Sequence, residues 1–138
     1  MKGTRVLGLD VGDVRIGVAL SDPMAVLATP LTIINRTEEP EDIQAILALV
    51  EEHEVGRIVV GLPLSMDGTQ SKQTDKVRAF ELALSRQTRV PVEFWDERLS
   101  TVTAKRMVQV VRKKTERGIR YDAMAAALIL QGYLDKVF

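Results

Sequence analysis

The sequence contains no cysteine and a single histidine, His53. These shortages exclude disulfide bonds, thiolate metal sites and any metal centre built from several histidines. A metal ion bound to this chain must therefore be held mainly by oxygen ligands. The absence of cysteine also agrees with a cytoplasmic protein, which is the location that we expect.

Long apolar runs are missing as well. No apolar stretch approaches the roughly 18–20 residues that a membrane helix needs, so we expect no contact with a membrane. Hydrophobic residues nevertheless make up 46% of the 138 residues, which is enough for a packed core without a covalent cross-link. We therefore expect one domain over residues 1–138.

The formal net charge is zero, but the two halves of the chain carry opposite charges. Residues 1–70 hold 5 basic and 11 acidic residues, whereas residues 71–138 hold 14 and 8. The basic residues are densest in residues 98–120, which we call the basic segment. Its members are Arg98, Lys105, Arg106, Arg112, Lys113, Lys114, Arg117 and Arg120. Such a segment can follow a phosphate backbone, although a solvated helix face followed by a polar loop produces the same pattern.

Three β-rich runs come first, over residues 6–10, 14–20 and 26–34. Gly12 and Asp13, between the first two runs, are typical of a hairpin turn. Pro30 interrupts the third run, which must then be an edge strand or a bulged one, because proline cannot donate to a central ladder. The short links predict an antiparallel meander.

Helices and strands alternate after the meander. In chain order we expect a helix that begins near Pro40, a strand over residues 57–62, a helix from about Lys72 to Ser85, a strand over residues 92–95, a helix capped by Ser100 or Thr101, and a last helix that begins at Asp122. This order predicts an α/β fold with a mixed five-stranded sheet. Two parallel strands would join the three-strand antiparallel meander, with helices on both faces.

Three acids occur where these elements should meet. Asp10 ends the first strand, Glu97 directly follows the fifth, and Asp122 opens the last helix. In α/β sheets ligands gather at the carboxyl ends of the strands, which parallel strands bring to the same edge. Three carboxylates there repel one another unless a cation lies between them. Oxygen ligands suit Mg²⁺ or Mn²⁺, the ions that phosphodiester cleavage uses.

Each acid also has an ordinary structural explanation. Asp122 can act as the N-cap of its helix. Glu97 can pair with Arg98 or Lys105 on the surface. Asp10 can close a turn through its own backbone, but an acid that ends an apolar strand is costly if it is buried without a partner. Asp10 is therefore the hardest of the three to explain without a ligand.

Four segments resemble the YqgF family, also called RuvX or Holliday-junction-resolvase-like. They are LGLDVGDVRIGVALSD, VVGLPLSMDGTQS, DERLST and DAMAAALILQGYL. The resemblance covers about residues 5–134, and the four motifs in this order at this length are specific. It implies a ribonuclease H-like fold and a divalent-metal nuclease whose acids map onto Asp10, Glu97 and Asp122.

The resemblance also implies a substrate. The role usually assigned to the family is maturation of the 5′ end of the pre-16S ribosomal RNA, and the older assignment is cleavage of four-way DNA junctions. True junction resolvases resemble the start of the last helix but place another carboxylate one turn later, where this chain has Ala125.

Arg15 and the basic segment are the residues that we expect to bind a nucleic-acid backbone, with strong dependence on salt. Arg98, beside Glu97, is the best placed to position a phosphate, although either arginine can instead pair with a nearby acid. The loop from Ser65 to Ser71 either holds a phosphate at a helix start or forms a plain Asp-Gly turn.

Two other classes of function fit part of the pattern. The D-x-G of Asp10 and Gly12, followed by a hairpin strand, also occurs in ATP-binding proteins of the actin, sugar-kinase and Hsp70 type. Those proteins hold nucleotide between two such domains, and this chain has the length of one. A non-catalytic transcription or ribosome-assembly factor would use the acids only as caps. The sequence leaves open RNA or DNA, and monomer or homodimer.

Overall fold

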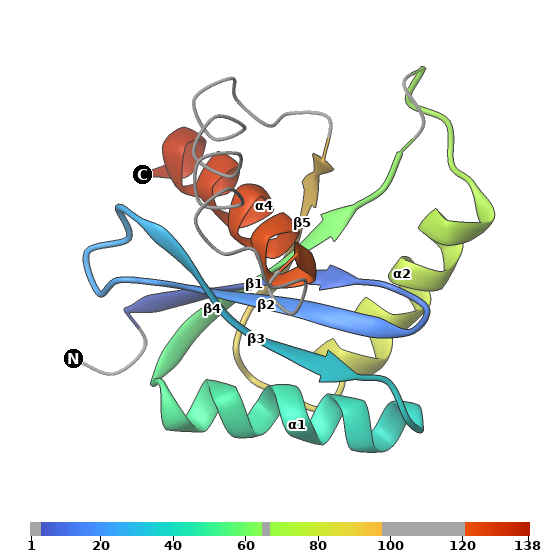
Figure 1. Cartoon of the computed structure of the whole chain (residues 1–138), viewed down its shortest axis with the longest axis horizontal. Helices are drawn as coiled ribbons and strands as arrows, with labels where there is room; N and C mark the ends of the chain where they lie inside the picture. The colour runs from blue at the N-terminus through green and yellow to red at the C-terminus, as the bar shows by residue number, and fades with distance from the viewer. Residues whose placement is uncertain (1–3, 65–66, 98–120) are drawn as a thin grey trace.

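The structure is a computed structural model that describes residues 4–64, 67–97 and 121–138 (Figure 1). Its elements are β1 (Arg5–Val11), β2 (Arg15–Ser21), β3 (Ala28–Asn35), α1 (Glu39–Glu52), β4 (Val55–Leu62), α2 (Lys72–Ser85), β5 (Val92–Asp96) and α4 (Tyr121–Val137). The expected helix after Ser100 or Thr101 lies outside the described residues. Among the described helices, none has the length and apolarity that a membrane span requires.

The strands form one mixed sheet in the order β3-β2-β1-β4-β5. β1 and β2 pair antiparallel, as do β2 and β3, whereas β4 runs parallel to β1 and to β5. The predicted meander with two added parallel strands is therefore confirmed. Parallel pairing brings the carboxyl ends of β1, β4 and β5 to one edge of the sheet.

The third strand is both an edge strand and bulged, as Pro30 predicted. Val18 pairs with Thr32 but Ala19 pairs with Pro30, so Leu31 is the extra residue of a bulge. The strand begins later than the apolar run suggested. The Asp22 carboxylate accepts backbone hydrogen bonds from Val26 and Leu27, both at 2.8 Å, and this holds the preceding residues in a loop.

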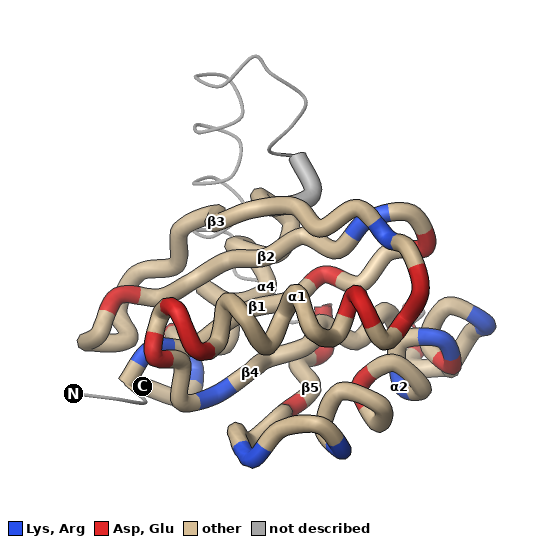
Figure 2. The backbone as a smooth tube through the Cα atoms, turned by 90° about the horizontal axis from the view of Figure 1, so that it is seen from below, with Lys and Arg blue, Asp and Glu red and all other residues tan. Residues whose placement is uncertain are grey.

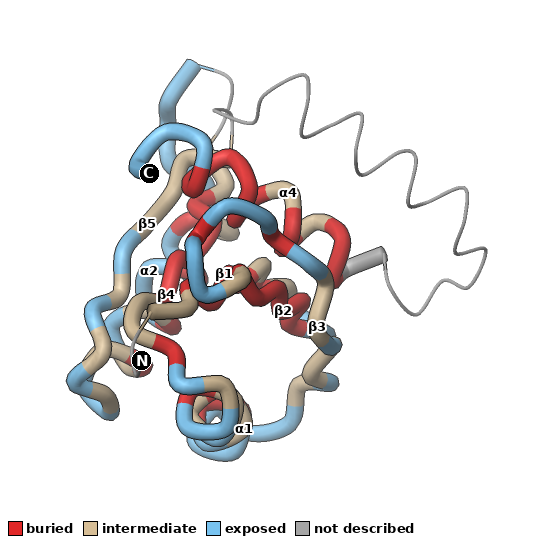
Figure 3. The backbone as a smooth tube through the Cα atoms, turned by 90° about the vertical axis from the view of Figure 1, so that its left-hand side faces the viewer, coloured by how far each residue is buried: buried red, intermediate tan, exposed pale blue. Residues whose placement is uncertain are grey.

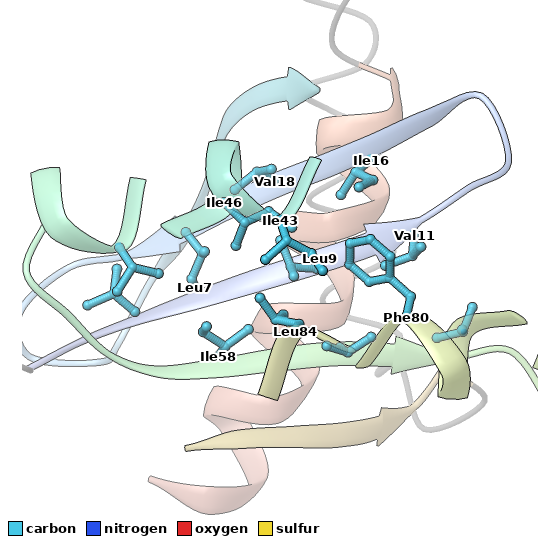
Figure 4. Close-up of a cluster of buried hydrophobic side chains, with 14 of the residues drawn as sticks. Leu7, Leu9, Val11, Ile16, Val18, Ile43, Ile46, Ile58, Phe80 and Leu84 are labelled. Carbon is cyan, nitrogen blue, oxygen red and sulfur yellow. The ribbon is translucent and has the colours of Figure 1, made fainter. Parts of the chain in front are cut away.

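Helices cover both faces of the sheet, as expected. α1 and α2 pack on one face and α4 packs on the other, with the central strands buried between them (Figures 1 and 3). The α1–α2 face contains large side chains, including Leu7, Leu9, Ile46, Ile58 and Phe80, which Figure 4 shows interlocking.

The α4 face is built from smaller residues. Its core includes Ala19, Ala28, Ala126 and Ala127. The helix lies close to the sheet at Gly8, where an added Cβ would lie 2.8 Å from the Cβ of Leu130. The glycine in β1 and the alanines of α4 thus allow close contact between helix and sheet.

The acidic excess of the first half of the chain lies largely on α1. The helix carries Glu39, Glu41 and Asp42 in its first turn and ends at Glu52, and acidic residues are prominent at both of its ends in Figure 2. Because α1 covers the face opposite α4, this negative charge lies away from the α4 face.

Candidate active site at the carboxyl edge of the sheet

Asp10 lies near the end of β1 and faces α4, because its neighbours Leu9 and Val11 belong to the core under α1 and α2. On β2 it pairs with Gly17. On β4 the residue beside it is Gly61, one step beyond the paired Leu9 and Val60. Neither neighbouring strand therefore places a side chain beside the half-buried Asp10 carboxylate.

Glu97 directly follows β5, two strands away from Asp10, and its side chain extends over β4. Trp95 pairs with Gly61, and strand alternation turns Glu97 to the same face as Trp95. A Cβ added at Gly61 would lie 3.2 Å from both the Cγ and the Oε2 of Glu97. The Glu97 carboxylate therefore lies over the α-carbon of Gly61.

The charges of these acids interact. Burial, followed by the negative charges of Asp10 and Asp96, raises the pKa of Glu97 from 4.5 to about 7. The structure thus brings Asp10 and Glu97 together at one edge, close enough for the charge of Asp10 to oppose ionisation of Glu97.

The third predicted acid, Asp122, is the second residue of α4, and its side chain lies outside the description. The next residue, Ala123, is described, and it lines a groove together with Arg15 and Asn35. These residues begin β2 and end β3, at the edge where β1 ends. α4 therefore begins near the carboxyl end of β1.

Among the side chains that the structure describes, no three histidine, cysteine or acidic groups gather closely enough to form a metal site. Asp10 and Glu97 are among these described side chains, and Asp122 is not. The carboxylates that the structure brings together are nevertheless oxygen donors of the kind that Mg²⁺ and Mn²⁺ prefer.

Two hollows share lining residues of the hairpin that follows Asp10, and Asp10 lines one of them. A pocket of about 290 Å³ is lined by Asp10, Gly12, Asp13, Val14 and Arg15. A groove of about 620 Å³ shares Val14 and Arg15 with it and continues along β3 to the start of α4. Arg15, which is exposed, lines both of them. The predicted phosphate contact thus lines the same pocket as the acid.

Hydrogen bonds stabilise the hairpin that carries Arg15, and one of them comes from Arg36, which is paired with Asp42 of α1. The backbone N–H of Gly12 donates to the carbonyl of Arg15 at 2.9 Å. Arg36 donates to the carbonyl of Gly12 at 3.0 Å, and its Nε lies 3.1 Å from the buried carboxylate of Asp42. Burial would raise the pKa of Asp42, but hydrogen bonds from Thr37 and Arg36 outweigh it and lower the pKa.

The other predicted binding residues fall into two groups. The basic segment, Arg98 to Arg120, lies wholly outside the described residues. In the loop before α2, Asp67 accepts hydrogen bonds from the backbone and hydroxyl of Thr69, at 3.0 and 2.7 Å. Ser71 is the N-cap of α2 and forms a capping box with Thr74. The described part of this loop is therefore a turn and a helix cap.

Gly61 is the residue of this site that sequence reasoning missed. Its signal was a glycine inside an otherwise apolar strand, which often marks a close approach of another group. Nothing local to the strand indicates which group approaches, because Glu97 lies 36 positions further along the chain.

Solved structures share this architecture. RuvC of T. thermophilus in complex with a Holliday junction substrate aligns with a TM-score of 0.62 at 13% identity, covering 97% of this chain and 96% of that one. The fowlpox virus Holliday junction resolvase aligns with a TM-score of 0.59 at 8% identity, covering 97% and 99%. The fold is thus the RuvC-like form of the ribonuclease H fold, as predicted.

Sequence relatives are much more similar. A protein of Clostridium acetobutylicum named "Putative pre-16S rRNA nuclease" is 46% identical over 134 residues, which cover 96% of this chain and 99% of the relative. A protein of Ruegeria pomeroyi with the same name is 48% identical over 131 residues, covering 94% and 85%. The profile of the RuvX family, described as Holliday junction resolvase, matches residues 4–136. The chain therefore belongs to the RuvX family, and it is a nuclease.

Proposed function

We propose that this nuclease matures the 5′ end of the pre-16S ribosomal RNA with the help of Mg²⁺ or Mn²⁺, held by Asp10, Glu97 and Asp122. The observation that carries the proposal is the meeting of Asp10 and Glu97 over Gly61. The names of the relatives support the RNA substrate. We further propose that residues 1–138 act as one domain in the cytoplasm.

A divalent cation suits this pair of acids. Asp10 and Glu97 repel each other strongly enough to help hold the pKa of Glu97 near 7, and a cation between them would replace this repulsion by attraction. When bound, such an ion supplies the positive charge that activates water and stabilises the leaving oxygen. The donor set therefore fits the ion that the proposed reaction needs.

The protein residues would share the remaining tasks. Asp10 and Glu97 would hold the ion, together with Asp122 at the start of α4. Gly17, opposite Asp10 on β2, adds no side chain beside its carboxylate, and the pocket that Asp10 lines would admit a phosphate. Arg15 lines the same pocket as Asp10 and would hold the phosphate next to the one that is cleaved.

Binding of the polynucleotide would come mainly from positive charge. We assign this role to Arg15 and to the basic segment, while the acidic α1 covers the face of the sheet opposite α4. Because each phosphate contact releases counterions, affinity for RNA should fall steeply as the salt concentration rises.

The test is a side-by-side cleavage assay on a pre-16S RNA fragment that carries the 5′ extension and on a four-way DNA junction. Each reaction is run with Mg²⁺, with Mn²⁺ and with a chelator. The variants are Asp10→Asn and, as a matched control, Asp75→Asn, which removes one exposed carboxylate from the first turn of α2.

We expect metal-dependent cleavage of the RNA that falls by about 10²–10³-fold in Asp10→Asn, since ligand loss removes several kcal/mol of charge stabilisation. Asp75→Asn should cleave normally. Preferred cleavage of the junction would replace RNA maturation by junction resolution. Binding without cleavage of either substrate, unchanged in Asp10→Asn, would support a non-catalytic binding module instead.

A further inference from the structure

A strand separates the backbone of Asp10 from that of Glu97. β4 lies between β1 and β5 in the sheet, so the backbones of β1 and β5 are about 10 Å apart, twice the usual strand spacing. A side chain that follows β5 can face one on β1 only by passing over β4. The residue that it passes over is Gly61.

Little space remains around Gly61. An added Cβ would lie 3.2 Å from the Cγ and Oε2 of Glu97 on one side, and 2.5 Å from the Cδ1 of Ile129 on the other. The position is therefore enclosed by the acid and by α4. Any side chain here would compete with Glu97 for the space that leads to Asp10.

Backbone conformation does not account for this glycine. Among the described glycines, Gly68 has a positive φ and Gly61 does not, so any residue could adopt the backbone conformation of Gly61. A glycine within a strand also weakens it, because it contributes no packing and loses more entropy on folding. The close approach of Glu97 and Ile129 is the remaining explanation.

We propose that Gly61 is a positioning residue, whose missing side chain leaves the slot in which the Glu97 carboxylate lies when it faces Asp10. This inference rests on the proposed function, because the task of the positioned carboxylate is to hold the divalent cation. Ligand distances in metal sites are tolerant to only about 0.2 Å. A methyl group that displaces Glu97 by a few tenths of an ångström is therefore sufficient to weaken the site.

The first variant is Gly61→Ala, and the primary measurement is Mn²⁺ binding by isothermal titration calorimetry without nucleic acid. We expect affinity for Mn²⁺ to fall about 10-fold or more, the usual effect of losing support for a metal ligand. In cleavage assays at subsaturating Mn²⁺, kcat should fall while KM for the RNA stays unchanged, because the slot does not contact the polynucleotide.

A second variant separates this effect from disturbed packing. Ile129→Val deletes the Cδ1 atom that the new methyl group would meet. In the double variant Gly61→Ala/Ile129→Val the contact with α4 is relieved, and the contact with Glu97 is kept. We expect the double variant to regain the melting temperature that Gly61→Ala loses, but not the affinity for Mn²⁺. Ile129→Val alone should bind Mn²⁺ like the wild type.

Each outcome bears on a different statement. Wild-type Mn²⁺ affinity in Gly61→Ala itself would overturn the positioning role of Gly61 and leave the proposed function intact. Recovery of both stability and affinity in the double variant would assign Gly61 to helix packing alone, which also overturns it. A wild-type protein that binds no Mn²⁺ would overturn the proposed metal site, and the role of Gly61 with it.

Discussion

The two faces of the sheet are packed in different ways. On the α1–α2 face, large side chains such as Leu9, Ile46 and Phe80 interlock and are almost completely buried. On the α4 face, Gly8 and the alanines of α4 bring backbone close to backbone. The acids Asp10 and Glu97 open on this second face. Burial of large apolar groups is thus concentrated on one side of the sheet, and the proposed chemistry lies on the other.

This division predicts that substitutions on the two faces differ in kind. A cavity on the α1–α2 face should lower stability without changing the site, because α1 and its core lie behind the sheet from Asp10. A change on the α4 face should move the helix that carries Asp122. The ratio of lost activity to lost stability is the quantity that distinguishes the faces.

The largest loss of stability is expected from Ile46→Ala. Ile46 is fully buried under α1, and removing such a side chain costs about 2–5 kcal/mol because a cavity remains. Urea unfolding should show this loss. The cleavage rate per folded molecule should equal that of the wild type at a temperature where both are folded; a reduced rate would show that the two faces are not independent.

A smaller loss, of about 1–3 kcal/mol, is expected from Gly8→Ala, because the added methyl overpacks the contact with α4. Its Cβ would lie 2.8 Å from the Cβ of Leu130 and 3.2 Å from the carbonyl oxygen of Ala126, and neither atom can rotate away. Activity per folded molecule should fall here, unlike in Ile46→Ala. Equal specific activities in the two variants would remove the proposed contrast between the faces.

Glu97→Gln should change how stability depends on pH in metal-free protein. The pKa of Glu97 is about 7 when folded against 4.5 ordinarily, so the folded state binds the proton more tightly. The stability that Glu97 contributes is therefore complete below pH 4.5 and is lost as the pH rises through 7. Glutamine does not titrate, and since solvent screens part of the effect the variant should be more stable than the wild type by about 1 kcal/mol at pH 8.

The control for this effect is the same comparison at pH 4.5, where thermal unfolding of the two proteins should differ little. Adding Mn²⁺ at pH 8 should reverse the order, because the ion stabilises the wild-type carboxylate and not the amide. A constant difference between the two proteins from pH 4.5 to 8 would contradict the raised pKa.

The smallest effect is expected from Tyr133→Phe, at the end of the α4 face remote from Asp10. The Tyr133 hydroxyl accepts a hydrogen bond from Arg57 at 2.6 Å and donates one to Glu93 at 2.5 Å. Removing it should cost about 0.5–1.5 kcal/mol, as urea unfolding would show. The cleavage rate should be unchanged, which would show that only the end of the α4 face near Asp10 contributes to activity. A fall in kcat would show that the end near Tyr133 contributes as well.

Local patterns were sufficient to predict most elements of the fold. Pro30 indicated an edge or bulged strand, and the helix from Lys72 to Ser85 was predicted with the bounds that the structure has. These features depend on residues that are neighbours in sequence. The topology followed from general rules of chain connection, and it was enough to bring Asp10 and Glu97 to one edge.

The parts that could not be predicted depend on register between distant segments. Gly61 meets Glu97 only because β4 and β5 pair with Gly61 opposite Trp95, and no local pattern determines that pairing. The same holds for Asp42, one of the five acids on α1, which is buried and paired with Arg36. Its burial depends on where the end of β3 places that arginine.

The bulge in β3 has a consequence for association between molecules. A free sheet edge invites another strand to add to it, which leads to aggregates or to sheets that continue through two subunits. Pro30 offers no N–H to an incoming strand, and the extra residue Leu31 disrupts the spacing of the remaining groups. β3 therefore discourages growth of the sheet in that direction, so a second copy of the chain would have to associate through another surface, such as a helix, a loop or the opposite edge at β5.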